Sequence, residues 1–572
     1  MTTPMRRLLW LVLPIAFVAL FCRELYTPDE PREAAMALTM LHQANKSLPT
    51  LGAEPFAEKP PLLYWLGAAT AAVGGDSAAA IRGANLLYLL LTALAIAALV
   101  RPVTTNDGVF AAGFVAVTAY ILYRTQIWFA TDAPLVTGVA IALLGMQRAF
   151  TSSSATRRAL GYGVLHLGLL ICFFAKGPAG WLVPGCAFLT VVVLERRWRE
   201  ILSRELWLGG AFIAAIVGAW LAWVANSPGG EQSLRVLLWY NLLGRFVKLE
   251  AADHLVYATG HQNTPVEYFF SLPIFMLPWT PLVIAALWKA PEALRKFGAT
   301  ATTWRIGVGA IVLPLILLAV SATGRDVYYG PVALGFAILV GLWVGSLRSL
   351  DERHTTDRSA QRAWIATRIF VGIFASICGS VALLATLAPA FRNFESTLLA
   401  VVAGVGWVGA LWLVMRRTAD NRPLQNLALS VTVCLTLVIG PLYHSLDRWL
   451  SLPSLAERVL AFTGKEALDV YEPDETITAV ASLYIPTASS STIISPGNRR
   501  ILWLVPDRSR WKAKSWFSYL GYRSAPRDPA PPVNLPAALQ NWALECVLER
   551  PGGRRVAIVA PPGSGPLKGV CR

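Results

Sequence analysis

The chain has 572 residues, a mean hydropathy of +0.51, 55% hydrophobic residues and only 15% charged ones. Soluble domains carry about 25% charged residues, so a soluble chain of this length could not bury so much apolar surface, and a bilayer must solvate most of it. The net charge is +16, but the Lys and Arg residues lie mainly in short gaps between apolar runs. This distribution fits membrane topology and argues against a nucleic-acid partner.

The apolar runs predict an all-α polytopic membrane protein with about 13 transmembrane helices, since a spanning helix needs about 20 apolar residues. The first run follows Arg6 and Arg7 and has no convincing cleavage site, so we expect an uncleaved spanning helix. The approximate limits are 7–22, 79–100, 107–124, 127–148, 160–175, 177–195, 206–225, 267–288, 306–322, 328–347, 367–388, 398–415 and 425–443.

The positions of the basic residues predict the orientation. With the N-terminus in the cytoplasm, every later basic cluster falls in a loop on that same side, as the positive-inside rule requires. An odd number of spans then places the C-terminus outside. The five clusters are Arg148, Arg157 and Arg158; Arg196, Arg197, Arg199 and Arg204; Lys289, Arg295, Lys296 and Arg305; Arg348, Arg353, Arg358 and Arg362; and Arg416, Arg417 and Arg422.

Residues 1–450 form the predicted membrane domain, with two long outer loops at 23–77 and 226–265. In the first loop, DEPREAAMALTMLHQ has the spacing of an amphipathic helix lying on the membrane, and PPLLYWLGAATAAVG is too short to span and is expected to be interfacial or re-entrant. Residues 451–572 alternate polar turns with short apolar runs, which predicts a small soluble α/β domain; its segment LPAALQNWALECVL looks helical.

Three carboxylates near the outer face are candidate catalytic groups. Asp29 and Glu30 follow the first span, and Asp132 lies near the outer end of the fourth. Each of the two aspartates has a plain alternative as a helix cap. Together, Asp29 and Asp132 could instead position and deprotonate an acceptor hydroxyl.

Cations on the same side are candidate phosphate ligands. Lys59, in FAEKPPLLYW, and Lys176, in FFAKGPAGW, stand alone in apolar surroundings at the outer boundary. Snorkelling to the interface is the alternative reading for both lysines. Compact positive charges also suit the phosphate of a lipid-linked leaving group, a task that Arg82, Arg245 and Arg325 could share.

Cofactor signals are weak. Glu58 and His261 could ligate a divalent metal, but His261 is equally a plain polar loop residue. No GxxxxGK[ST] motif is present, which disfavours ATP-driven transport, and no HExxH motif is present. Cys546 and Cys571 both fall in the predicted soluble domain. If that domain is periplasmic, the two cysteines could form a disulfide or remain free thiols.

Several of these segments together carry a family resemblance. The chain resembles the GT-C superfamily of membrane glycosyltransferases, and within it the bacterial protein-mannosyltransferase-like group, especially the aminoarabinose transferases that modify lipid A. The similarity extends from the N-terminus to about Pro331. It rests on DEPRE, EKPPLLYW, Arg82, TDAPL, AKGPAG, GHQNTPVEYF with Pro278 and Trp279, and GRDVYYGP.

The resemblance implies a sugar donor carried by undecaprenyl phosphate, an acceptor that is lipid A or another envelope glycan, and an active site on the periplasmic side of the bacterial inner membrane. It implies that Asp29 is the catalytic carboxylate, that Asp132 is the second acid, and that the sugar is transferred with inversion. It also implies that Lys59, Lys176 and Arg325 hold the donor phosphate. Some relatives use a divalent metal, which would fall at Glu58 and His261. Three tyrosines in the same motifs are expected to contact the acceptor or line the pocket: Tyr64, Tyr328 and Tyr329.

Other functions stay open at the level of sequence. A transporter or flippase of lipid-linked sugars would want charged sites near the bilayer midplane, whereas the candidate residues cluster at one face. A glycosyltransferase acting on protein acceptors and a structural membrane subunit are further alternatives.

Overall fold

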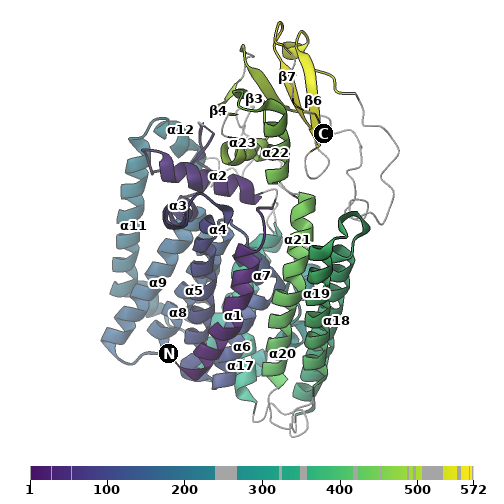
Figure 1. Cartoon of the computed structure of the whole chain (residues 1–572). Coiled ribbons are helices and arrows are strands. Elements are labelled where there is room, and N and C mark those ends of the chain that lie inside the picture. The colour runs from purple at the N-terminus through teal and green to yellow at the C-terminus, as the bar shows by residue number, and fades with distance from the viewer. Residues whose placement is uncertain are drawn as a thin grey trace.

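The computed structural model describes the chain except residues 1, 27–28, 53, 239–266, 321–324, 348–356, 417–422, 451, 486–487, 494–496, 506–531, 550–554, 566, 568, 570 and 572. Long helices form a bundle, and α2, α3 and a small sheet domain lie at one end of it, which we call the domain end (Figure 1). The N-terminus lies at the opposite end. The bundle is apolar around and within, as a membrane protein requires.

The helices of the bundle run through most of the first 450 residues. Their bounds are α1 (Thr3–Phe21), α5 (Gly83–Val100), α6 (Asn106–Thr118), α7 (Tyr120–Ile127), α8 (Asp132–Thr151), α9 (Ala155–Lys176), α10 (Leu182–Leu194), α11 (Arg204–Ala225), α13 (Glu267–Phe275), α14 (Thr280–Leu294), α15 (Ala299–Gly309), α16 (Val312–Val320), α17 (Tyr329–Ser346), α18 (Arg358–Thr386), α19 (Phe394–Met415), α20 (Pro423–Val433) and α21 (Ile439–Leu450). Within the described ranges, ten helical segments are long and apolar enough to span, or eleven if α6 and α7, bent by 60°, count as one.

The difference from the thirteen expected spans comes from broken helices. The 40-residue segment Ala155–Leu194 contains both α9 and α10. Arg158 in the first turn of α9 pairs with Glu200, just beyond α10, at 2.9 Å, so this segment crosses and returns. Neither α13 nor α14 is long enough alone. Counting the hairpin as two passes and the broken α13–α14 pair as one restores the expected thirteen.

Two helices of the first long loop lie across the domain end. They are α2 (Asp29–His42) and α3 (Leu62–Gly74), joined through the short strands β1 (Thr50–Leu51) and β2 (Glu54–Pro55), and α4 (Ala78–Ile81) leads into α5. The interfacial prediction for the α3 segment fits its 13-residue length. The helix expected from DEPREAAMALTMLHQ is present as α2, and its charged residues Glu30, Arg32 and Glu33 are buried as well as its apolar ones.

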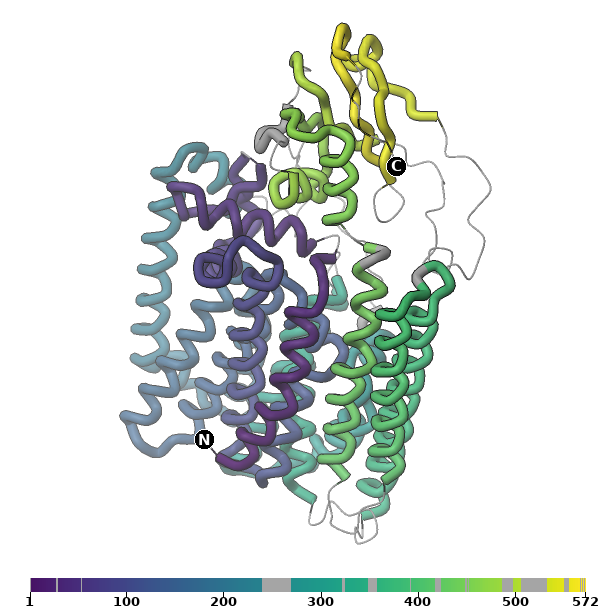
Figure 2. The backbone as a smooth tube through the Cα atoms, viewed as in Figure 1, coloured from purple at the N-terminus to yellow at the C-terminus, as the bar shows by residue number. Residues whose placement is uncertain are grey.

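The polar face of α2 is covered by the C-terminal domain. This domain begins at α22 (Leu452–Thr463) and contains α23 (Glu475–Tyr484), which packs on α2. Its five-stranded sheet has the order β4-β3-β5-β7-β6, with β3 parallel to β4 and β5 and the remaining pairs antiparallel. Figures 1 and 2, drawn from the same side, show this domain at the end of the bundle that carries α2. The strands are β3 (Leu468–Tyr471), β4 (Ala488–Ile493), β5 (Arg500–Leu504), β6 (Ala543–Glu549) and β7 (Arg555–Ala560).

The C-terminal domain confirms the α/β prediction and corrects one element of it. Helices α22 and α23 bury Leu455, Val459 and Val480 against one face of the sheet. Part of the segment expected to be helical is the strand β6, which pairs with β7 because its alternating residues fit the face of a sheet. Cys546 and Cys571 form a disulfide.

Candidate active site

Asp29 stands at the centre of a charged cluster at the domain end. It is the first residue of α2, and its carboxylate accepts hydrogen bonds from Arg325 at 3.0 Å and from Arg32 at 3.3 Å. The Asp29 side chain is 24% exposed, so it is held in place while remaining reachable. The α17 side of the bundle supplies Arg325, which brings two distant motifs of the sequence into contact.

Glu33, one turn further along α2, is the buried anchor of the cluster. Its fully buried carboxylate accepts hydrogen bonds from Lys59 at 2.8 Å, from Arg32 at 2.8 Å and from the Tyr64 hydroxyl at 2.5 Å. Burial alone would raise the pKa of Glu33, but the charges of Lys59 and Arg32, with the hydrogen bonds, lower it to about 2. Glu33 is therefore an anion at ordinary pH, and it fixes Lys59 beside Arg32.

Asp132 and Lys176 form the third part of the cluster. Asp132 begins α8, Lys176 ends α9, and the lysine donates a hydrogen bond to the aspartate. The ammonium group also lies 4.5 Å from the ring centre of Tyr328. Burial lowers the pKa of Arg325, but the electrostatic influence of Asp29, Tyr328 and Asp132 is larger, so the pKa is raised overall. Arg325 is therefore close enough to interact with both aspartates of the site.

Glu30 and Arg82 lie below this cluster, in a buried ion-pair network. Both Glu30 oxygens are held by Arg23, at 2.6 and 2.8 Å, and they also accept from the backbone amides of Tyr26 and Phe129. Despite burial, the charges of Arg23 and Arg82 and these hydrogen bonds lower the pKa of Glu30. Because its side chain is fully buried and both of its oxygens accept hydrogen bonds from the protein, the geometry favours a structural role for Glu30, which joins the loop before α2 to the segment between α7 and α8.

Arg82 has the same structural surroundings. Its side chain is fully buried and donates to the carbonyls of Leu20 and Arg23, at 2.5 and 2.9 Å. These contacts fasten the end of α1 to the start of α5. The geometry therefore favours a structural role over the phosphate-binding role expected from the sequence.

The three candidate tyrosines occupy different places. Tyr64 is buried and bonded to Glu33, and Tyr328 lies beside Lys176. Tyr329 is 1% exposed and packs edge-on against Phe275, with the ring centres 4.8 Å apart. Tyr328 is thus placed at the site, whereas Tyr329 belongs to the core beneath it.

The proposed metal site is tested only in part. Glu58 lies beside Lys59, while His261 and the phosphate candidate Arg245 lie outside the described residues. Among the residues that are described, no group of three or more His, Cys, Asp or Glu side chains could hold a metal ion.

Sequence reasoning missed Arg32, Glu33 as an anchor, and Glu475. Arg32 donates to Glu475 of the C-terminal domain at 2.5 Å as well as to Asp29 and Glu33. The spacing within DEPRE could have indicated the Asp29–Arg32 pair, which are neighbours on a helix at i and i+3. Nothing in the local sequence around Glu475 points to a partner in α2.

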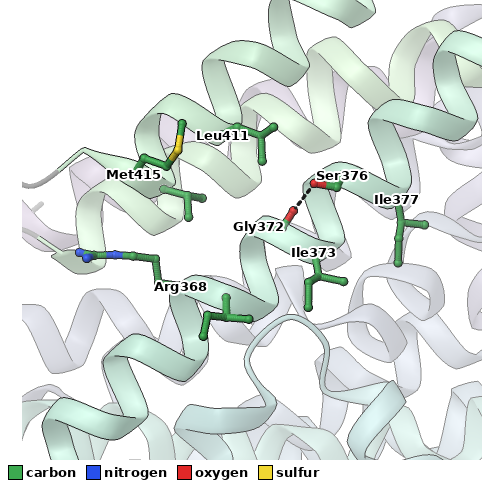
Figure 3. A pocket seen from close by; sticks show the side chains of 9 residues that line it. Arg368, Gly372, Ile373, Ser376, Ile377, Leu411 and Met415 are labelled. Atoms are coloured by element: carbon green, nitrogen blue, oxygen red, sulfur yellow. Dashed lines mark hydrogen bonds between the residues drawn. The ribbon is translucent and has the colours of Figure 1, made fainter.

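A separate open pocket of about 460 Å³ lies between α18 and α19 (Figure 3). Its walls are mainly apolar, with Arg368 and Ser376 as the polar members, and the Ser376 hydroxyl donates to the carbonyl of Gly372. None of the charged residues described above lines it. Its apolar walls fit a position in the membrane domain and give no reason to place the reaction there.

Comparison with known proteins fits this architecture. The family model described as dolichyl-phosphate-mannose-protein mannosyltransferase matches residues 58–223. The crystal structure of ArnT from Cupriavidus metallidurans bound to undecaprenyl phosphate superimposes with a TM-score of 0.68 and 18% identity, over 98% of both chains. The chain has the fold of ArnT. The crystal structure of the same ArnT in the apo state matches with a TM-score of 0.66 over 96% of this chain.

Curated relatives extend the similarity to sequence. The chain is 28% identical over 347 residues to the undecaprenyl phosphate-alpha-4-amino-4-deoxy-L-arabinose arabinosyl transferase of Pseudomonas aeruginosa strain UCBPP-PA14, covering 59% of each protein. It is 25% identical over 399 residues to the transferase of that name from Edwardsiella ictaluri, covering 66% of this chain and 65% of the relative. The chain spans about three fifths of the length of the first Pseudomonas relatives. The resemblance indicated by the sequence motifs is confirmed.

Proposed function

We propose that this protein is an inverting membrane glycosyltransferase that moves a sugar from undecaprenyl phosphate to lipid A or another envelope glycan. The observation that carries the proposal is the cluster at the domain end, where a reachable carboxylate, Asp29, stands among Lys59, Lys176, Arg32 and Arg325. Such an arrangement supplies both a base and a binding place for a lipid-linked phosphate. The names and fold of the relatives support the same reaction class.

In the proposed reaction, an acceptor oxygen attacks the anomeric carbon from the side opposite the carrier phosphate. The bond between the anomeric carbon and the phosphate oxygen breaks, and its electron pair leaves with undecaprenyl phosphate. Lys59, Lys176 and Arg325 stabilise that leaving group, and Arg32, next to them, adds a fourth charge. Asp29 takes the proton of an acceptor hydroxyl; for an acceptor phosphate, already ionised, Asp29 acts by positioning.

We place the domain end on the periplasmic side of the inner membrane. The basic loops of the sequence favour a cytoplasmic N-terminus, and the N-terminus lies at the end opposite the charged cluster. The Cys546–Cys571 disulfide in the C-terminal domain fits an oxidising compartment. Both arguments support the same orientation.

A transport function is less well supported. Alternating-access transporters place their charged sites near the bilayer midplane, between two halves of the molecule. Here the paired charges gather where α2, α8 and α9 reach the domain end. A protein acceptor is the nearer alternative, because the matching family model is described by protein mannosylation.

The direct test is a transfer assay with the purified full chain in detergent. The protein is incubated with undecaprenyl phosphate carrying 4-amino-4-deoxy-L-arabinose or a hexose, with lipid A or a protein fraction as acceptor. We expect a product whose mass exceeds that of lipid A by one sugar residue, that is, by the free sugar less one water, and that forms only with the lipid-linked donor. No transfer to either acceptor from any undecaprenyl-linked sugar would refute the proposal, and transfer only to protein would replace the acceptor.

A further inference from the structure

The C-terminal domain reaches the proposed phosphate site through one side chain. Glu475 lies in the first turn of α23, where the Asp474 carboxylate accepts from the backbone amide of Ile477 at 2.9 Å and so fixes the start of the helix. Its carboxylate accepts a hydrogen bond from Nη1 of Arg32 at 2.5 Å. Further along α23, Leu483 packs against the hydrophobic cluster of α2 and α3. The domain is therefore docked by an apolar contact and an ionic one.

Arg32 is shared among three carboxylates that differ in burial. Its Nη2 donates to Asp29 and to Glu33, both on α2 itself, whereas Nη1 donates to Glu475. The side chain of Glu33 is fully buried, but that of Glu475 is 54% exposed. In the described part of the chain, the buried Nε of Arg32 has no hydrogen-bond partner, so the donors of this guanidinium are not all used. Glu475 is the partner that an incoming anion displaces most easily.

The charges of the cluster also point to Glu475 as the carboxylate that a bound phosphate would replace. In the ion pairs described above, four cations, Arg32, Lys59, Lys176 and Arg325, meet three carboxylates of the membrane domain, Asp29, Glu33 and Asp132. Glu475 is the further carboxylate in these pairs, and it comes from the C-terminal domain. A sugar attached through a phosphodiester brings one negative charge to the same place, so donor and Glu475 are electrostatic substitutes for each other.

We propose that Glu475 is a positioning residue whose carboxylate holds Arg32 in the empty site and competes with the donor's phosphate for it. The inference rests on the proposed function, because it assumes that the cluster binds the phosphate of a polyprenyl carrier. Through this contact the C-terminal domain sets the affinity of the membrane site for its lipid. Glu475 touches no reacting atom and acts only through Arg32.

Equilibrium binding of undecaprenyl phosphate to the full chain in detergent tests the inference. Glu475→Gln removes the charge and keeps the size, and we expect it to bind about threefold to tenfold more tightly, since a competing negative charge is gone. The gain should shrink in about 1 M salt, where the screening length falls to roughly 3 Å. Glu475→Asp keeps the charge and should stay close to wild type, as should Ser482→Ala on an exposed position of α23.

The outcomes separate the two claims. Unchanged or weaker binding by Glu475→Gln, with an unchanged apparent melting temperature, overturns the competition, while binding by the wild type leaves the proposed function standing. Wild-type protein that binds no undecaprenyl phosphate overturns the proposed function and this inference with it. In steady-state assays, competition also predicts a lower KM for the donor in Glu475→Gln, which a merely structural contact would not produce.

Discussion

Asp29→Asn is expected to lower kcat for sugar transfer by about 10²- to 10⁴-fold, the range that a general base contributes. The amide keeps the size of the side chain and the preference for the start of a helix, so α2 should form normally. It removes the negative charge that Arg325 and Arg32 contact at 3.0 and 3.3 Å. Donor binding should therefore be retained or slightly tightened, and the loss should fall on kcat.

Asp326→Asn provides the matched control for this prediction. Asp326 follows Arg325, is 57% exposed and pairs with Arg124 at 3.3 Å, so it lies next to the site without touching Asp29. We expect its kcat to stay within about twofold of wild type, as for most exposed pairs. Transfer by Asp29→Asn at the wild-type rate, measured by product mass over time, would remove Asp29 from the mechanism.

Glu30→Ala is expected to cause the largest loss of stability, about 3–5 kcal/mol, as for other broken buried ion pairs. Arg23 would keep its charge with a side chain only 1% exposed and would lose both of its carboxylate contacts. The amides of Tyr26 and Phe129 would lose their acceptor as well. The apparent melting temperature in detergent should fall sharply, and the yield of folded protein with it.

The control for Glu30 is Glu292→Ala, which breaks an exposed cluster with Lys289 and Lys296 at the other end of the bundle. Surface pairs contribute little, so its melting temperature should hardly move. Activity per folded molecule distinguishes a structural role for Glu30 from a catalytic one. If Glu30→Gln has the melting temperature of the wild type but transfers sugar far more slowly, Glu30 is a catalytic residue.

The architecture could be predicted from the sequence because a bilayer requires apolar segments of a fixed length, and these can be read directly along the chain. Apolar length predicted the helices of the bundle, and the 13-residue α3 was recognised as too short to span. The sequence could not show which charged residues pair with each other. Lys59 contacts Glu33, 26 residues away, and Lys176 contacts Asp132, 44 residues away, whereas both lysines were predicted only as phosphate ligands. The motifs brought the right residues to one end of the molecule without showing which touch.

The differences between the sequence predictions and the structure share one physical cause, which is burial by a distant part of the chain. Glu30 and Asp29 are neighbours in the same motif, but only the structure shows that Glu30 turns inward to Arg23 while Asp29 meets Arg325. The DEPRE motif does not indicate that the C-terminal domain covers α2, yet α23 packs on this helix. Arg245 and His261 lie outside the described residues, so their roles stay predictions.

The affinity of Lys59→Met for undecaprenyl phosphate tests most directly the claim that this cluster holds a carrier phosphate. Loss of one charged hydrogen bond, about 1.5–3 kcal/mol, should weaken binding roughly 10- to 100-fold. Glu33 would keep Arg32 and Tyr64 as partners, so the variant should fold. Lys289→Met, an exposed lysine at the opposite end, should bind like wild type. Equal affinity for Lys59→Met and wild type would contradict the assignment of the phosphate site.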